Sequence, residues 1–309
     1  MEVFDHHVHV LSPALVERLK SLSVPFSKPD YAYSDIDSIL KFNPADGMFL
    51  LSMAYLYGSP EFADSSERVN VKTENDFVAG LARKHPGKLF AFCGVNPLRD
   101  YAAGELLRCR RDLGMYGLKL HFASSGVSLK NPAHLARVRD ILSVAAGEGM
   151  PVVLHFDNGN ETFDAADADF LIDSVLAPGP AMELYLAHLG TSEGYTYMTR
   201  ILLRRFTDAM KNLSALGKHR VFFDISAVGL TEGSEQSPPL TPEDFADLSG
   251  QLTELGLERV VFGTDYPVFN AAAYLTALES NMTLTRRELI GIVWNGIPTM
   301  GVTIRHPGY

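Results

Sequence analysis

Eight short apolar runs, separated by segments with helical periodicity, are the feature that most constrains how this chain can fold. Near-continuous hydrophobic strands alternating with helices are typical of a parallel sheet buried on both faces, and eight such strands close a barrel. The sequence therefore predicts an α/β fold, a (β/α)8 TIM barrel. An open doubly wound sheet is the alternative, but no Gly-x-Gly-x-x-Gly follows the first run, where a dinucleotide would need it. The runs cover residues 3–10, 47–54, 88–95, 116–121, 151–155, 183–188, 220–225 and 259–263, and the main helical patterns cover 65–85, 102–113, 132–149, 165–176 and 193–216.

The length of 309 residues fits one such domain, 1–309, with an insertion after the first strand. The insertion, 11–44, is longer than a short loop and one helix require. It follows the carboxyl end of strand one, where barrel active sites lie, so we expect it to cover that rim as a lid. Phe26, Tyr31 and Tyr33 favour an ordered lid over a floppy linker.

The charge balance and the cysteines narrow the class of partner. A formal charge of −10, from 27 Lys and Arg against 37 Asp and Glu, argues against nucleic acid and anionic membranes. A small-molecule substrate is expected instead, and a homodimer is compatible with the sequence. Cys93 and Cys109 form no Cys-x-x-Cys pair, so no disulfide framework or thiolate zinc site is predicted. Without signal-peptide features or a stretch as long as a membrane span, a cytoplasmic location is expected.

Two histidines lie two residues apart in the first apolar run. Because side chains alternate along a strand, His7 and His9 should share one face with Asp5, and His6 should point the opposite way. Two imidazoles on a rigid strand can chelate a metal. Taken alone, such a pair also suits a half-buried polar edge, so further ligands must come from elsewhere in the chain.

Those further groups lie at the ends of other predicted strands. His121, His155 and His188 end strands four, five and six, and Asp265 follows strand eight. Five of the ten histidines at one rim are hard to attribute to packing, because each buried imidazole needs polar partners, which a metal would supply. The remaining histidines are expected to be structural or solvated: His6, His85, His134, His219 and His306.

Five motifs carry a resemblance to a known family. They are DHHVH at 5–9, GLKLH at 117–121, VLH at 153–155, LAHLG at 186–190 and FGTDYP at 262–267. In this order they resemble the amidohydrolase superfamily, specifically the amidohydrolase-related branch of TIM-barrel hydrolases and decarboxylases with mostly mononuclear zinc sites. The resemblance covers nearly the whole chain. One departure is the sequence WNGIP at 294–298, where the family usually has an Asn-Ala pair.

The resemblance implies metal ligation by His7, His9, His155 and Asp265, with His188 as the catalytic histidine. Three imidazoles and one carboxylate suit Zn²⁺ better than Mn²⁺ or Fe²⁺, and a water in an open position would have its pKa lowered to roughly 7. That water is the expected nucleophile. Asp265 would accept its proton, and His188 would polarise the substrate or shuttle a proton. A fifth ligand or a core histidine is the other interpretation of His188.

Lys119 and His121 share a strand face by parity and are candidate substrate contacts. In binuclear relatives, a carboxylated lysine on strand four bridges two metals. The preferred interpretation of Lys119 is a buried lysine paired with a carboxylate, because an unpaired buried ammonium is costly.

Three functions agree with these residues. The first is hydrolysis of a small-molecule amide, lactone or ester by a zinc-activated water. The second is zinc-dependent non-oxidative decarboxylation of a small carboxylic acid on the same site. The third, a metal-binding barrel without turnover, is disfavoured because binding alone needs no proton-transfer pair such as His188 and Asp265. Aromatic residues near the rim, Tyr55 among them, could line a substrate wall or simply pack.

Overall fold

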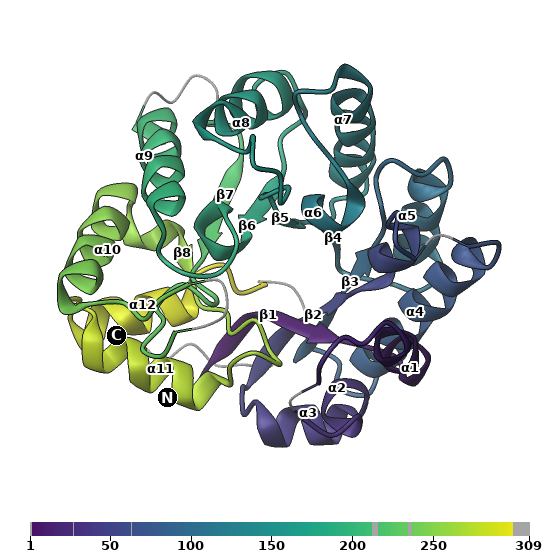
Figure 1. Cartoon of the computed structure of the whole chain (residues 1–309), viewed down its shortest axis with the longest axis horizontal. Coiled ribbons are helices and arrows are strands. Elements are labelled where there is room, and N and C mark those ends of the chain that lie inside the picture. The colour runs from purple at the N-terminus through teal and green to yellow at the C-terminus, as the bar shows by residue number, and fades with distance from the viewer. Residues whose placement is uncertain (1, 27, 63, 212–215, 234–236, 299–309) are drawn as a thin grey trace.

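A computed structural model describes residues 2–26, 28–62, 64–211, 216–233 and 237–298. Its eight strands form one parallel sheet in the order β1 to β8, curled into a ring with helices around the outside (Figure 1). The predicted α/β class and the parallel eight-stranded sheet are confirmed. The strands are β1 (Phe4–Val10), β2 (Gly47–Ser52), β3 (Leu89–Gly94), β4 (Gly117–His121), β5 (Val152–His155), β6 (Glu183–Leu186), β7 (Arg220–Asp224) and β8 (Val260–Val261).

Backbone hydrogen bonds also join the first strand to the chain around β8. His6 N donates to Phe262 O at 3.0 Å, and His9 N donates to Tyr266 O at 2.9 Å. The ends of the curled sheet therefore meet, as a TIM barrel requires.

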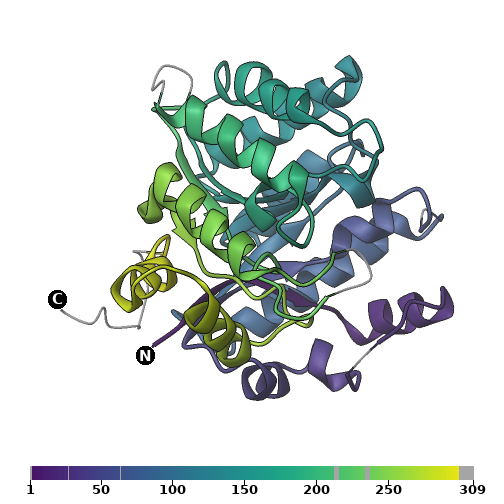
Figure 2. The same ribbon diagram turned by 60° about the vertical axis from the view of Figure 1, so that its left-hand side comes forward.

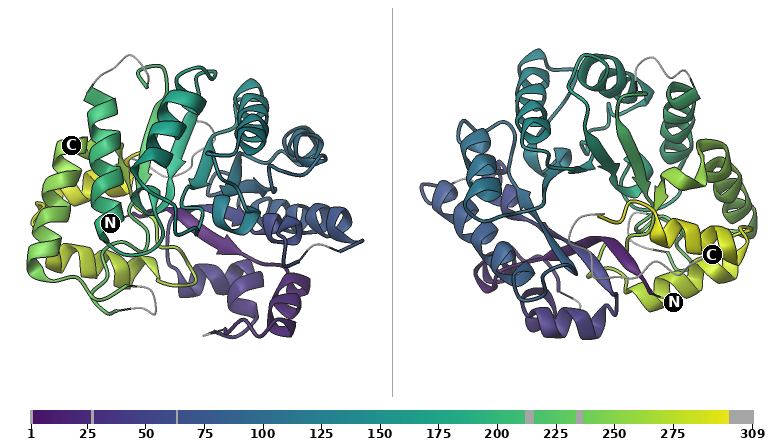
Figure 3. Two further views of the ribbon diagram at one scale, coloured as in Figure 1. Left: turned by 45° about the horizontal axis from the view of Figure 1, so that its top comes forward. Right: turned by 180° about the vertical axis from the view of Figure 1, so that it is seen from behind.

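Helices occupy the positions that the periodicity predicts, and Figure 3 shows them from two further sides. The predicted helix 193–216 starts later, at Tyr197, because Thr196 Oγ1 accepts a hydrogen bond from Thr199 N and so acts as an N-cap. Its last part includes 212–215, which lie outside the described residues. The helices are α1 (Pro13–Ser21), α2 (Tyr31–Ser34), α3 (Ile36–Phe42), α4 (Glu67–Ala82), α5 (Ala102–Arg111), α6 (Phe122–Ser125), α7 (Pro132–Gly147), α8 (Ala165–Asp169), α9 (Tyr197–Lys211), α10 (Pro242–Leu255), α11 (Ala271–Asn281) and α12 (Arg286–Trp294). Short helical turns complete the set: η1 (Ala54–Gly58), η2 (Phe170–Leu176), η3 (Ala187–Gly190) and η4 (Leu257–Arg259). Among the described helices, none has the length and apolar character needed to cross a bilayer.

The core has two parts. A larger one fills the space between the sheet and the helices, and a smaller aromatic cluster fills the inside of the ring. Such interior layers make a barrel a packed core rather than a pore, and leave its carboxyl end for chemistry. The inner cluster consists of Phe4, Phe49, Leu51, Phe90, Phe92, Val153, Tyr185, Phe222 and Val261.

A bulge in β1 changes the predicted side-chain directions. The pairing with β2 shifts register between Asp5 and Val8, so strict alternation fails there. The His6 ring packs 4.9 Å from the inner Phe49 ring, which makes the prediction that His6 points outward wrong. Asp5 does not join His7 and His9 either; it accepts hydrogen bonds from Asn43 Nδ2 at 2.7 Å and Thr264 N at 3.0 Å. The extra residue lets His6 and His7 both turn towards the inside.

The segment 11–44 folds as α1, α2 and α3 beside β1, the purple helices in Figure 2. Leu11 N donates to Tyr33 O at 2.9 Å, which closes the segment on itself. Tyr266 OH donates to Ala32 O at 2.7 Å, and Lys28 Nζ donates to Pro267 O. The segment is thus tied to the loop that carries Asp265.

Candidate metal centre and active site

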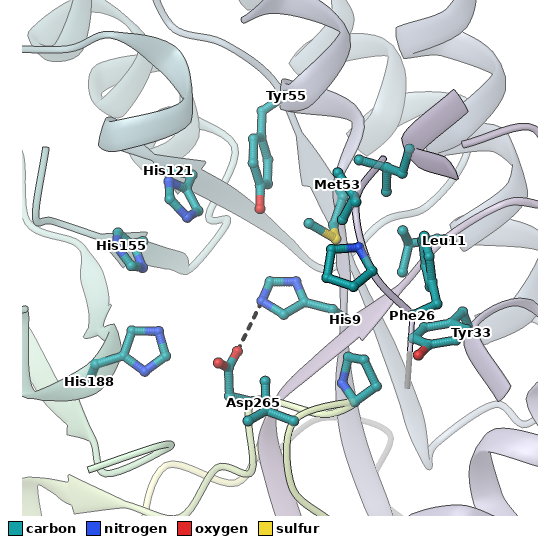
Figure 4. A pocket seen from close by; sticks show the side chains of 15 residues that line it. His9, Leu11, Phe26, Tyr33, Met53, Tyr55, His121, His155, His188 and Asp265 are labelled. Carbon is teal, nitrogen blue, oxygen red and sulfur yellow. Dashed lines mark ion pairs between the residues drawn. The ribbon is translucent and has the colours of Figure 1, made fainter. Parts of the chain in front are cut away.

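Three predicted metal ligands meet at the carboxyl end of the sheet. His7 Nε2 and His9 Nε2 are 3.1 Å apart, and Asp265 Oδ1 lies 3.4 Å from the first and 3.1 Å from the second. Figure 4 marks the contact between His9 and Asp265. The two imidazoles come from β1, and the carboxylate follows β8 on a residue with a φ of 55°. A left-handed backbone at a non-glycine residue is a cost that proteins tolerate mainly at functional sites.

The chemistry of this trio fits a divalent metal. Ligand atoms about 2.0–2.1 Å from a tetrahedral ion lie roughly 3.3 Å from one another, and the three separations above are close to that value. Nδ1 of His7 donates to Asp224 Oδ2 at 2.6 Å, which leaves the Nε2 lone pair directed at the site. Burial lowers the pKa of both His7 and His9, so the imidazoles favour the neutral form that binds metals.

Asp265 is held in its charged form. Burial alone would raise the pKa of its carboxyl, but the imidazoles of His188, His9 and His7 outweigh burial and keep that pKa well below its usual range. The carboxylate is therefore charged at neutral pH and can serve as a ligand.

His188 lies directly beside this trio. Its ring centroid is 4.9 Å from that of His7, and ligand atoms of His7, His188 and Asp265 lie within 4.8 Å of one another. Nδ1 donates to Ser226 O at 2.9 Å, so Nε2 is the nitrogen left for a substrate, a proton or a metal. The left-handed φ of 52° at His188 marks a second constrained backbone position in the site.

His121 and His155 form a stacked pair at the edge of the trio. Their rings are parallel within 8° with centroids 3.9 Å apart, and the His155 ring lies 5.1 Å from that of His188. His155 Nε2 is 3.5 Å from Ser192 Oγ. The short contacts among donors do not include His155, so its role as a ligand stays a prediction.

Lys119 lies in the interior of the sheet, next to the predicted metal ligand His7. It is fully buried, and its Nζ is 3.3 Å from His7 Nε2. Burial lowers the pKa of Lys119 to about 8, against the opposing charges of Asp265 and Asp224. The predicted burial of Lys119 agrees with this position, but among the described residues its side-chain contact at hydrogen-bond distance is with His7 and not with a carboxylate. Its contact with substrate stays a prediction.

Two supporting residues escaped the sequence reasoning. Asp224, at the end of β7, accepts a hydrogen bond from His7 and so holds its ring. Ser226 Oγ lies 3.2 Å from Nδ1 of His7 and 3.1 Å from Nδ1 of His188, so it links the two histidines. The available signal was an acidic residue ending an otherwise apolar strand, β7.

A cavity of about 530 Å³ opens on this site. In Figure 4, His121, His155, His188 and Asp265 lie on one side, and Leu11, Phe26 and Tyr33 lie on the other. Within the described part of the chain, no lysine or arginine lines the cavity. The lining residues are His9, Leu11, Leu19, Val24, Pro25, Phe26, Tyr33, Met53, Tyr55, His121, His155, His188, Asp265, Pro267 and Val268.

Comparison with known families identifies the class of protein that this fold and site define. The family model described as amidohydrolase matches residues 5–289. The chain therefore belongs to the amidohydrolase family and is an enzyme of the amidohydrolase superfamily, as the motifs predicted. No curated protein matches the sequence significantly.

Solved structures with the same fold include decarboxylases. The chain is similar to 5-carboxyvanillate decarboxylase from Sphingomonas paucimobilis, with 15% identity, a TM-score of 0.63, and coverage of 95% of this chain and 96% of that one. A putative amidohydrolase from Staphylococcus aureus gives 15% identity, a TM-score of 0.61, and coverage of 95% and 97%. A dihydroxybenzoic acid decarboxylase from Polaromonas sp. JS666, solved with bound manganese and the inhibitor 2-nitroresorcinol, gives 16% identity, a TM-score of 0.58, and coverage of 95% and 94%.

Proposed function

We propose that this enzyme is a divalent-metal-dependent, non-oxidative decarboxylase of a small aromatic carboxylic acid. The observation that carries the proposal is the two-sided cavity, in which a wall of imidazoles and one carboxylate faces an apolar wall without lysine or arginine among the described residues. Similar structures that are decarboxylases support the same reaction. The sequence favoured hydrolysis and kept decarboxylation as the alternative, so the cavity reverses that order.

The cavity suits the charge changes of decarboxylation. The ring carbon that bears the carboxylate is protonated first, and the C–C bond then breaks with its electron pair returned to the ring, so the carboxylate charge is lost as neutral carbon dioxide forms. An apolar wall favours this loss of charge, because it offers the carboxylate no water or cation. Hydrolysis, by contrast, needs a water held close to the scissile bond.

A divalent cation held by His7, His9 and Asp265, with His155 as the fourth predicted ligand, would supply positive charge for the acidic oxygens of the substrate. Zinc suits this donor set, and manganese is the second ion to test because the Polaromonas enzyme binds it.

His188 is the proposed proton donor. Its Nδ1 is fixed by Ser226 O, so a proton on Nε2 faces the cavity. This proton moves to the ring carbon before carbon dioxide leaves, and the balance is R–COO⁻ + H⁺ giving R–H + CO₂. His121, which lines the cavity, is the proposed substrate contact. The positive charge of Lys119 would act on the metal ligands, because Lys119 Nζ lies 3.3 Å from His7 Nε2.

We also propose that the segment 11–44 acts as the lid of this single domain. Side chains of this segment supply much of the apolar wall: Leu11, Leu19, Val24, Pro25, Phe26 and Tyr33. By excluding water, such a lid would favour loss of carbon dioxide and protect the proton on His188.

Hydrolysis of an amide, lactone or ester is the second candidate. It is favoured by the Asp265 carboxylate, which lies 3.1 Å from His9 Nε2 and could accept a proton from a water in the site.

Product analysis separates the two reactions. The enzyme loaded with Zn²⁺ or Mn²⁺ is incubated with hydroxybenzoates and, separately, with aryl amides, lactones and esters, while carbon dioxide and hydrolysis products are quantified. Metal-dependent carbon dioxide release that is lost in Asp265→Asn and after chelation supports the proposal. Metal-dependent hydrolysis without carbon dioxide release from the acids would overturn it in favour of the second candidate.

A further inference from the structure

Tyr55 is a polar side chain of the cavity that has no role in the reaction described above. It lies in η1, just after β2, and only 1% of the residue is exposed. Its ring stacks on that of His121, with centroids 5.1 Å apart. Figure 4 shows the hydroxyl directed into the cavity, between His121 and His9.

The Tyr55 hydroxyl is free to bind a ligand. Among the residues that the structure describes, none forms a hydrogen bond with it. Burial, together with the charge of Asp265, raises the pKa of Tyr55, so the group stays a neutral donor. The other tyrosine of the lining, Tyr33, already accepts a hydrogen bond from Lys28 N at 3.1 Å. Because the hydroxyl faces the cavity, a ligand that fills the cavity either supplies a partner for it or leaves it unpaired, so a ligand that supplies one is selected over a ligand that does not.

The charges around the cavity limit what that partner can be. Among the described residues that line the cavity, Asp265 is the one acidic side chain, and none is a lysine or an arginine. A second carboxylate on the substrate would therefore find no side-chain cation in the cavity, whereas a hydroxyl, methoxy or carbonyl oxygen needs none.

We propose that Tyr55 determines specificity by donating a hydrogen bond to a neutral oxygen substituent of a substrate that has one carboxylate on an otherwise apolar ring. The inference rests on the proposed function, since it places the single carboxylate at the metal end of the cavity. It adds to that function a residue that recognises the oxygen substituent through a hydrogen bond. It also explains why dicarboxylates are excluded, since the second carboxylate would find no side-chain cation among the described lining residues.

Ligand binding tests this without relying on turnover. The Mn²⁺-loaded enzyme is titrated calorimetrically with benzoate, the three monohydroxybenzoates and isophthalate. Wild type, Tyr55→Phe and Tyr57→Phe are compared; Tyr57 is a matched control because it lies in the same turn, is 6% exposed and does not line the cavity. At least one hydroxybenzoate should bind wild type about 10-fold more tightly than benzoate, the effect of one neutral hydrogen bond. Tyr55→Phe should remove that preference, leave benzoate within about twofold, and Tyr57→Phe should keep the wild-type pattern.

Several results would overturn the inference. They are a hydroxybenzoate preference that survives in Tyr55→Phe, an equal loss in Tyr57→Phe, isophthalate binding as tightly as the best hydroxybenzoate, or no binding of any probe to wild type. Binding with the expected pattern but without carbon dioxide release would support the role of Tyr55 and contradict the proposed reaction, so the two failures are distinguishable.

Discussion

Asp224 positions the predicted metal ligand His7 through a hydrogen bond. Its carboxylate accepts the Nδ1 proton of His7 at 2.6 Å and the Ser226 backbone N–H at 2.6 Å, so it is held rigidly while it holds the imidazole. Burial raises the pKa of Asp224 and lowers that of His7, which makes each group dependent on the other for its working form. Carboxylate support of this kind fixes the tautomer and raises the basicity of the ligand nitrogen.

Replacement of Asp224 should therefore weaken metal binding while the fold persists. In Asp224→Asn we expect the affinity for Zn²⁺ or Mn²⁺ to fall about 10- to 100-fold, measured by competition with a chelator. Asp112→Asn, at an exposed position after α5, is the control and should bind like wild type. An unchanged affinity in Asp224→Asn would show that the hydrogen bond to His7 does not support the site.

His188 is expected to act on the substrate rather than hold the metal. His188→Ala should keep about one metal per chain, because His7, His9 and Asp265 remain, while kcat falls about 10²- to 10⁴-fold, the usual contribution of a general acid. Elemental analysis and kinetics on the same preparation check this. A folded variant that has lost its metal would make His188 a ligand instead.

The sequence was sufficient to predict which reacting groups lie at one rim, but not the directions of their side chains. His7, His9, His188 and Asp265 could be placed at one rim because parallel strands all end on the same side. Directions within β1 could not be predicted, since the bulge between Asp5 and Val8 depends on pairing with β2. The pairing of Asp224 with His7 was equally hidden, because it joins residues 217 apart that only the curvature of the sheet brings together.

Among the helices, α1 and α4 are joined by a buried carboxyl group. Glu74 on α4 accepts hydrogen bonds from Ser12 N at 2.8 Å and Ser12 Oγ at 2.5 Å, and Ser12 is also the N-cap of α1. This contact anchors the start of the segment 11–44 to the helix layer. Burial raises the pKa of Glu74 to about 7, although the bonds from Ser12 oppose the rise.

This carboxyl group should make stability depend on pH. Between its ordinary pKa of 4.5 and about 7, Glu74 binds more protons in the folded protein than in the unfolded chain, so its contribution to the free energy of unfolding falls as pH rises through that window. The loss should reach at most about 3 kcal/mol. The difference in free energy of unfolding between wild type and Glu74→Gln, measured by chemical denaturation, should therefore fall from pH 4.5 to 7.5. Asp5, whose pKa burial also raises to about 7, and His6, whose pKa burial lowers to about 4, contribute equally to both proteins.

Glu17→Gln, at an exposed site on α1, serves as the control and should follow wild type. A pH profile of Glu74→Gln identical to that of wild type would rule out the proposed titration of Glu74.

Element boundaries could be predicted where a local signal exists. Pro132 follows Asn131, whose side chain caps α7 at the start of the predicted helix 132–149, and a capping box of Thr241 and Asp244 starts α10. No local sequence signal indicated which residues of the segment 11–44 form the apolar wall of the cavity. Which of its residues face the cavity depends on contacts such as Tyr266 OH to Ala32 O, which no local pattern reveals.

In the whole molecule, the curled sheet places the packed aromatic core and the candidate active site in different parts of the ring. The inner aromatic cluster that includes Phe49 and Tyr185 packs the inside of the ring, and the carboxyl end above it holds the imidazoles and Asp265. The alternation of apolar runs and helices was enough to predict this architecture, because eight parallel strands have few other ways to bury both faces. The volume and lining of the cavity could not be predicted, since they depend on side chains from distant loops.

An anomalous-scattering crystal structure of the enzyme loaded with Zn²⁺ or Mn²⁺ tests the proposed metal centre directly. We predict one strong anomalous peak about 2.0–2.2 Å from His7 Nε2, His9 Nε2 and Asp265 Oδ1, with the His188 side chain facing the ion across the space for the substrate. The same map decides whether His155 is the fourth ligand. The absence of a peak at this trio in metal-loaded crystals, or a peak elsewhere in the chain, would contradict the proposed metal centre and the decarboxylation built on it.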